Sequence, residues 1–226
     1  MRISINRSIL LAFAAALLSI CACVPEFSHP LTDEKTSEID PQLLGRWEVL
    51  DEKKDNVIKH KSFWIFSRQE GMQNTLDFRD ETLPPVSKNG AKPDTDKTKD
   101  HSNAFTTKIG SKHYISIGGV KSDEDGMFDP PQDEKDAYII CRYDISKDGF
   151  LTIYFMDQEI LGQDVAAKKI PGIVQYSGKR KNHFDNVQIT AEPSQIAKYL
   201  EAKGDACFKQ DMLVKLRRVG EPGEEK

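Results

Sequence analysis

Apolar and polar residues alternate along much of the chain after residue 40, which is the pattern of β-strands with one buried face. Every second residue is apolar from position 139 within the run 137–145, and again from position 151 within the run 150–156. Asp148-Gly149 between these runs is typical of a tight hairpin turn, and Gly110-Ser111 separates two further runs in the same way. The runs predicted as strands are 41–50, 62–67, 75–79, 105–109, 114–120, 137–145, 150–156, 186–190 and 212–218.

The spacing of apolar residues changes in the C-terminal third. Within residues 157–169 they fall on one helical face, and Pro171-Gly172 ends that helix. Ser194 is a suitable N-cap for a second helix, which is predicted to end near Gly204. The predicted fold class is therefore mainly β with minor α. We expect an antiparallel β-barrel or strongly curved sheet of about eight or nine strands, with two short helices near the C-terminus.

The amino terminus carries a different pattern. Arg2 and Arg7 make its start positive, and residues 9–20 are then apolar except for Ser19. This run is too short to cross a bilayer as a permanent helix, and small residues follow it. Residues 1–22 are therefore predicted to be a secretory signal peptide.

The end of this leader resembles the lipidation motif of bacterial lipoproteins. Cys23 follows the small Ala22 and has Ile20 three places before it, whereas the alternative, Cys21, would follow bulky Ile20 directly. The resemblance implies acyl chains on Cys23 as the contact with the membrane, with each buried methylene contributing about 0.8 kcal/mol. Because Val24 is not the aspartate associated with inner-membrane retention, the resemblance also implies the outer membrane of a bacterial cell envelope, facing the periplasm.

Composition divides the rest of the chain into three parts. Residues 23–40 are polar, include two prolines and show no periodicity, so they are predicted to form a flexible tether. Residues 41–219 are predicted to form one domain, and residues 220–226 a disordered tail. Two long polar segments inside the domain, 83–102 and the acidic 121–136, are predicted to be exposed loops.

The first predicted strand carries Gly45-Arg46-Trp47, which resembles the Gly-x-Trp motif of lipocalins and lipocalin-like proteins. In that family the tryptophan closes one end of an antiparallel barrel, and an arginine from a late strand often packs over it. The resemblance implies this role for Gly45 and Trp47, with Arg218 as the cation and Arg217 as the second choice. Such a contact contributes about 0.5–2 kcal/mol. A solvated arginine near the chain end is the alternative.

A wider pattern resembles a group of uncharacterised bacterial lipoproteins. They share an early Leu-x-Gly-x-Trp, here residues 43–47, and a late strand and helix, here 187–190 and 194–203. A phenylalanine and a Leu-Arg-Arg ending follow, here Phe208 and residues 216–218. The resemblance implies a folded shell and a location in the envelope, and no activity.

Charge narrows the range of partners. The chain has a formal net charge of −4 and becomes more acidic when the two arginines of the leader are removed. An acidic chain without a concentrated basic stripe argues against nucleic acid as a partner. It also argues against a polybasic patch for anionic lipids.

Few residues are arranged for metal binding or catalysis. The acidic run 123–126 is similar to a calcium loop, but Lys121 stands at the first position and Gln132 replaces the glutamate of the twelfth, where anionic oxygens are needed. The histidines lack the spacing of zinc ligands. No Gly-x-Ser-x-Gly elbow and no phosphate-binding glycine loop is present. No metal, cofactor or catalytic residue is therefore predicted, and an envelope hydrolase with an unrecognised site is the weakest of the alternatives.

Two cysteines lie in the predicted domain, Cys141 in an apolar strand and Cys207 after a helix. Outside the cytosol they could form a disulfide, and the alternative is a pair of buried thiols that never meet. In either case Cys141 would be a poor nucleophile in its apolar surroundings.

Binding without chemistry is the predicted activity. A small barrel is either packed solid or holds one apolar ligand, and the aromatic residues expected inside it suit both. In the second alternative, an inhibitor, immunity-type or assembly-accessory lipoprotein with a solid core docks an envelope protein through its acidic loops. The aromatic residues expected inside the barrel are Phe63, Phe105, Tyr143 and Phe155.

Overall fold

The structure is a computed structural model of the chain, and it describes residues 24–50, 61–83, 101–118, 137–178 and 183–220. Cys21 and Cys23 lie outside these residues, as do the leader, the tail and nearly all of the two predicted loops, 83–102 and 121–136.

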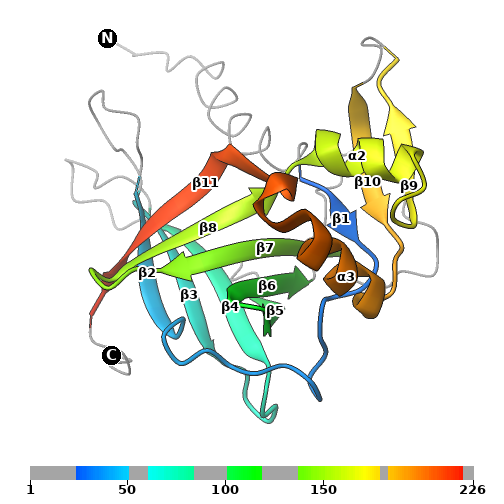
Figure 1. The fold of residues 1–226 in the computed structure, drawn as a ribbon. Coiled ribbons are helices and arrows are strands. Elements are labelled where there is room, and N and C mark those ends of the chain that lie inside the picture. The colour runs from blue at the N-terminus through cyan, green and yellow to red at the C-terminus, as the bar shows by residue number, and fades with distance from the viewer. Residues whose placement is uncertain (1–23, 51–60, 84–100, 119–136, 179–182, 221–226) are drawn as a thin grey trace, which may run out of the picture.

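Eight antiparallel strands close into a barrel (Figure 1). Each strand from β2 to β7 pairs with the next along the chain, and β11 fills the gap between β8 and β2. The predicted mainly β fold with an antiparallel barrel is thereby confirmed. The barrel strands are β2 (Gly45–Leu50), β3 (Lys61–Arg68), β4 (Leu76–Leu83), β5 (His101–Ile109), β6 (Lys112–Gly118), β7 (Tyr138–Ile145), β8 (Phe150–Met156) and β11 (Phe208–Val219).

The sheet continues beyond the barrel on one side of β7. β1 (Glu26–Phe27) pairs antiparallel with β7 and parallel with β10 (Phe184–Ile189), and β10 pairs with β9 (Gly172–Tyr176). Figure 1 shows β9 and β10 projecting from the barrel at the upper right. The helices lie in the same part of the chain: α2 (Gln158–Ala166), α3 (Pro193–Lys203) and the short 3-10 helix η1 (Gly204–Cys207). β1 and β9 have no counterpart among the predicted strands.

Both predicted hairpins form. Ile145 pairs with Leu151 across the Asp148-Gly149 turn, where Gly149 has a φ of +79° that suits glycine. The turn at Gly110-Ser111 joins β5 and β6.

The two predicted helices also form, and one begins differently from the prediction. The N-cap of α3 is Glu192, not Ser194, and the side chain of Glu192 forms a reciprocal capping box with Gln195. α2 is capped by Asp157, whose carboxylate accepts hydrogen bonds from two backbone N–H groups of the first turn.

The wall of the barrel separates two hydrophobic clusters. The inner cluster fills the barrel and draws residues from all eight of its strands. The outer cluster packs α2, α3, β1, β9 and β10 against the outside of the barrel. Buried residues of the outer cluster are Phe27, Leu31, Tyr114, Ile140, Met156, Leu161, Val165, Ile170, Phe184, Val187, Ile189, Ala191, Ile196, Tyr199, Leu200, Cys207 and Phe208.

The segment predicted as a tether, residues 23–40, is instead packed against the domain over residues 24–40. Phe27 is buried in the outer cluster, and the backbone N–H of Leu31 donates to Ser116 Oγ at 3.0 Å. Ser37 Oγ donates to the carbonyl of Thr106, also at 3.0 Å. A few isolated apolar and hydroxyl residues hold this segment in place. Such anchors produce no periodicity, which is why the composition predicted a tether.

Candidate functional site

The pairing register defines which side chains face the inside of the barrel. Trp47 on β2 lies opposite Trp64 on β3, and Trp64 lies opposite Asp80 on β4. Directly paired residues share a face of the sheet, so these three side chains form one row on the inner surface. The same reasoning places Cys141 and Phe155 inside, on β7 and β8.

One half of the interior, called the closed half here, holds the fully buried Leu43 and Trp47. The segment between β1 and β2 runs across the barrel end near the start of β2, below the barrel in Figure 1. Leu43 from that segment is fully buried, and its carbonyl accepts a hydrogen bond from Trp47 Nε1 at 2.8 Å. Tyr143 donates its hydroxyl hydrogen to Asp40 Oδ2 at 3.0 Å, and burial raises the pKa of this tyrosine.

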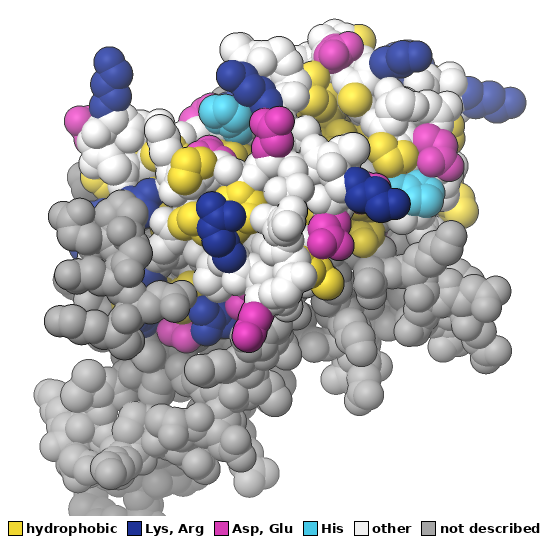
Figure 2. Space-filling model, turned by 90° about the horizontal axis from the view of Figure 1, so that it is seen from below, with side chains coloured by type: hydrophobic (Ala, Val, Ile, Leu, Met, Phe, Trp, Pro, Cys, Tyr) yellow, Lys and Arg dark blue, Asp and Glu magenta, His cyan; other side chains and the backbone are white. Residues whose placement is uncertain are grey.

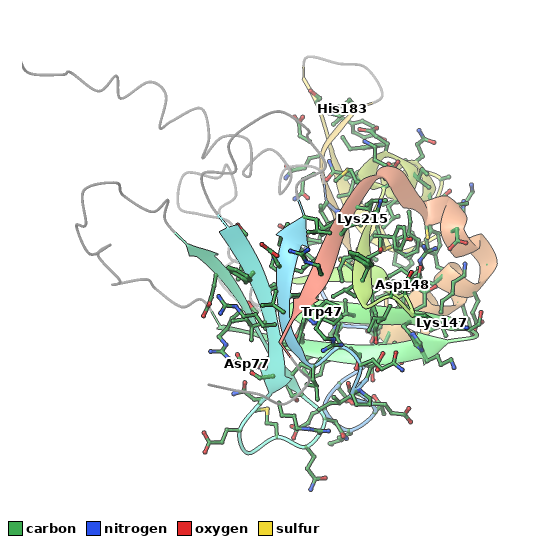
Figure 3. All side chains as sticks on the ribbon, turned by 90° about the vertical axis from the view of Figure 1, so that its left-hand side faces the viewer. Trp47, Asp77, Lys147, Asp148, His183 and Lys215 are labelled. Atoms are coloured by element: carbon green, nitrogen blue, oxygen red, sulfur yellow. The ribbon has the colours of Figure 1, made fainter. Side chains whose placement is uncertain are left out.

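The arginine that covers Trp47 is Arg218. Its guanidinium carbon lies 4.2 Å from the centre of the Trp47 ring, where β11 pairs with β2; Trp47 is labelled in Figure 3. Arg218 Nη1 donates to the Leu44 carbonyl at 2.6 Å, and Nη2 donates to the Gln42 carbonyl. Arg217, the second choice from the sequence, points outward and pairs with Glu48 at 2.6 Å.

Gly45 belongs to the same arrangement. Its φ of +123° is strained for residues with a side chain, and a Cβ at this position would lie 3.0 Å from Arg218 Nη1. The glycine therefore permits the close approach of the guanidinium to the first strand. Gly45, Trp47 and Arg218 therefore act together to close this end of the barrel.

The other half of the interior, called the open half here, is only partly covered. The described strands β2, β4 and β6 end here, at Leu50, Leu83 and Gly118, and β3, β5 and β7 begin here. The apolar side chains that face inward here pack against the inner cluster but remain partly exposed. This open-half apolar set consists of Val49, Trp64, Phe78, Ile139, Phe155 and Val214.

Trp64 and Asp80 bring a polar pair into the open half. The side chain of Trp64 donates a hydrogen bond to the Asp80 carboxylate, and Phe78 meets the Trp64 ring edge-on at a centroid distance of 5.4 Å. Desolvation by surrounding atoms raises the pKa of Asp80 despite this bond, although the side chain stays accessible to solvent. The Asp80 carboxylate keeps lone pairs that can accept a hydrogen bond from another molecule.

The sequence alone did not single out Trp64 and Asp80 as a pair. Both lie in or near predicted strands, but their contact depends on the register of the β3–β4 hairpin, which the intervening turn sets. An acidic residue at an inward position was the available signal, and it becomes visible only once that register is known.

The predicted inward aromatics divide between the two faces. Tyr143 and Phe155 point inside, whereas Phe63 and Phe105 lie on the outer face. Phe63 is covered there by Arg46, whose guanidinium carbon is 3.9 Å from the ring centre. β3 is apolar on both faces, so its alternation could not identify the inner one.

The two cysteines of the domain are free thiols, so the alternative of a Cys141–Cys207 disulfide is wrong. Cys141 belongs to the inner cluster and Cys207 to the outer cluster, and the barrel wall separates them. Burial raises the pKa of Cys207 to about 12 and raises that of Cys141 further. Neither thiol supplies a thiolate near neutral pH.

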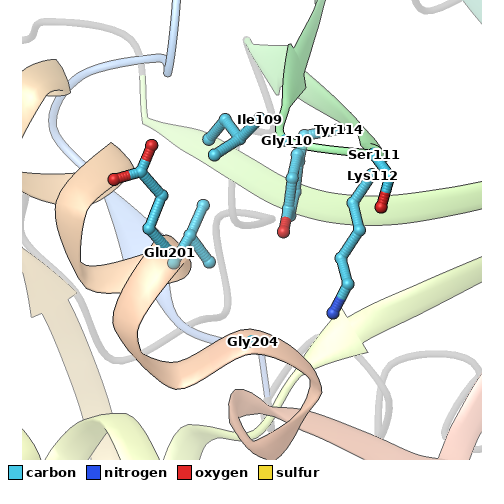
Figure 4. A pocket seen from close by; sticks show the side chains of 8 residues that line it. Ile109, Gly110, Ser111, Lys112, Tyr114, Glu201 and Gly204 are labelled. Carbon is cyan, nitrogen blue, oxygen red and sulfur yellow. The ribbon is translucent and has the colours of Figure 1, made fainter.

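A separate cavity of about 240 Å³ lies outside the barrel, between the β5–β6 turn and α3 (Figure 4). Ile109, Leu200 and the ring of Tyr114 form its apolar walls. Lys112 at its rim is held by Asp205, with 2.6 Å between Nζ and the nearer carboxylate oxygen. The cation at this cavity is therefore already paired.

The described residues contain neither a candidate metal site nor a helix that could span a membrane. Within these ranges, no three His, Cys, Asp or Glu side chains are grouped so that they could hold a metal ion. None of the helices in the described ranges has the length and apolar character needed to span a membrane. The face seen in Figure 2 mixes acidic, basic and apolar side chains, so charge of one sign does not dominate it.

Comparison with known proteins finds no match to this chain among family models, curated proteins or solved structures. The barrel is compatible with a lipocalin-like fold on its strand pairing and closure alone.

Proposed function

We propose that the protein is a lipid-anchored protein of the bacterial cell envelope that binds an apolar small molecule in the open half of its barrel. The observation that supports this proposal is a group of inward apolar side chains that stay partly exposed toward one end of the barrel. Trp47 in the closed half is fully buried, while the open-half apolar set stays partly exposed. Apolar surface left open to water is unfavourable, and a bound apolar molecule would cover it.

The polar pair narrows the class of ligand. Pockets of this kind use a few polar groups to orient an otherwise apolar molecule. Asp80 offers carboxylate oxygens beside the Trp64 indole, so the ligand that fits best has an apolar body and one hydroxyl or amino group.

Contact quenching of tryptophan fluorescence tests the binding site. The chain has two tryptophans, of which Trp47 is fully buried and Trp64 is partly exposed. A brominated long-chain alcohol bound in the open half should quench Trp64 in the Trp47→Phe variant and leave Trp47 nearly unquenched in the Trp64→Phe variant. Equal quenching in both variants, or none in either, would contradict the proposed site.

A pair of matched substitutions tests the same site without relying on fluorescence. Ile139→Lys places a charge on the inner face of β7, whereas Thr152→Lys places one on the outer face of the neighbouring β8. We expect the first to weaken binding of the alcohol at least about tenfold and the second to leave it unchanged. Circular dichroism spectra should show both variants folded.

The location is tested by the mass of the protein isolated from its native cells. Loss of residues 1–22 together with added acyl mass on Cys23 is expected, and Cys23→Ala should abolish the added mass while Cys21→Ala should not. A mass that includes the leader, or that lacks any acyl group, would overturn the envelope assignment.

A further inference from the structure

The strand order of the sheet ends at β9 within the described part of the chain. Each strand of the barrel has a neighbouring strand on both sides because the barrel is closed. β1 lies between β7 and β10, and β10 lies between β1 and β9. β9 is hydrogen-bonded to β10 alone, so its outer row of backbone donors and acceptors is available.

This edge lacks the features that normally prevent a strand from pairing with another chain. Edge strands are usually protected by charged residues, by proline or by bulges. The sequence of β9, Gly172–Tyr176, contains no charged residue and no proline, and the irregularity in its pairing lies on β10. Ile173 and Tyr176 are 56% and 59% exposed, which is unusual for side chains of their size.

Two backbone hydrogen bonds show which groups point toward the free edge. The Pro171 carbonyl accepts from the N–H of Thr190 at 3.1 Å, and the N–H of Ser177 donates to the His183 carbonyl at 2.8 Å. Residues 171 and 177 are therefore turned toward the neighbouring strand. By alternation, the N–H and carbonyl groups of Gly172, Val174 and Tyr176 face outward.

We propose that β9 pairs antiparallel with β9 of a second copy of the protein, about a two-fold axis at Val174. In this register Val174 lies opposite its own counterpart, and its outward N–H and carbonyl make a reciprocal pair of hydrogen bonds. Ile173 lies opposite Gln175 of the second copy. This register extends the sheet across both molecules.

A second copy fits this edge for two reasons. Self-pairing brings the same short sequence together twice, and no like charges meet within the five paired residues of β9, none of which is charged. The register also places Tyr176 opposite Gly172 of the other copy, where the missing side chain leaves room for the ring. The dimer should be weak and concentration-dependent, since a pair of five-residue strands buries less than the roughly 1,000 Å² of a stable interface.

The test is the molecular mass of the full-length protein in detergent, measured by light scattering over a range of concentrations. The variant Ile173→Lys/Gln175→Lys puts lysine opposite lysine twice, and should weaken the dimer about tenfold. The variant Ile173→Lys/Gln175→Glu puts lysine opposite glutamate at the same positions, and should restore it at low salt.

Thermal unfolding of both variants establishes that the domain is intact, since both changed residues are exposed. A wild-type protein that is monomeric at all concentrations would overturn the proposal. So would a dimer that persists unchanged in the double-lysine variant, because another surface would then form it. Recovery of the dimer only in the lysine–glutamate variant would establish the register.

Discussion

The two halves of the barrel interior are built from the same strands, yet they differ in how far their inward apolar side chains are buried. In the closed half, the segment before β2 crosses the end, and Leu43 and Trp47 lose all contact with water. In the open half β2, β4 and β6 end and β3, β5 and β7 begin, and the inward apolar residues stay partly exposed. The comparison indicates that the buried residues of the closed half stabilise the fold, and it is the basis of the proposal that the open half binds a ligand.

The largest expected effect separates the two tryptophans. Trp47→Ala should cost about 3–5 kcal/mol of unfolding free energy, because it leaves a cavity at a fully buried position and removes the ring beneath Arg218. Trp64→Ala should cost about 1–2 kcal/mol, because its ring is only partly buried. Urea unfolding followed by circular dichroism measures both, and equal losses would remove the distinction between the halves.

The next effect concerns the two neighbouring arginines. Arg218→Ala removes hydrogen bonds to two backbone carbonyls and the contact with Trp47, so we expect a loss of about 2 kcal/mol. Arg217→Ala removes only an exposed pair with Glu48 and should cost less than about 0.5 kcal/mol. Urea midpoints of the two variants provide the measurement, and a reversed order would contradict the role of Arg218 in closing the barrel.

A smaller effect lies outside the barrel, at Asp164 of α2. Burial alone would raise the pKa of this carboxyl, but hydrogen bonds from Lys169, Lys203 and Tyr199 prevail and lower it to about 2. Because the folded pKa is below the ordinary value, the stabilisation is present above about pH 4 and is lost as pH falls toward 2. Asp164→Asn should therefore cost about 1 kcal/mol at neutral pH and little at pH 2, as measured by urea unfolding at both values.

The smallest expected effect is a gain in stability, and it concerns Asp80 in the open half. Desolvation raises the pKa of Asp80, so its ionised form opposes folding at neutral pH, and this cost disappears as pH falls below the raised value. Asp80→Asn should slightly increase the thermal midpoint at pH 7 and leave it unchanged in acid. A lower thermal midpoint of Asp80→Asn at pH 7 would mean that the Asp80 carboxylate stabilises the folded protein, which would contradict the expected cost of its ionised form.

Local signals in the sequence predicted much of this fold. The hairpin at Asp148-Gly149, the second hairpin at Gly110-Ser111 and both helices depend on neighbouring residues, and these elements form as predicted. Their physical cause is short-range: turn residues with suitable φ values and apolar residues at a fixed spacing. Trp47 and Arg218 could be paired in advance only through the resemblance to lipocalins.

The features that the sequence did not predict depend on contacts between segments far apart in the chain. Residues 24–40 carry few apolar residues, and the sites that hold them, such as Ser116 and Thr106, lie far along the chain. The open-half polar pair depends in the same way on a register that composition does not reveal. The separation of Cys141 from Cys207 follows from which side of the barrel wall each residue faces, and the sequence left that question open.

The last strand, β11, has a consequence for how the molecule is made. It completes the barrel by bonding to both β8 and β2, and the ion pair between Arg217 and Glu48 joins residues 169 positions apart. During synthesis, β2 and β8 each lack a pairing partner on one side until β11 has been synthesised, which is almost at the end of the chain. Such long-range closure is slow and leaves the nascent protein prone to aggregation. Truncation after residue 207 would therefore remove a single strand and leave a chain unable to reach a soluble folded state.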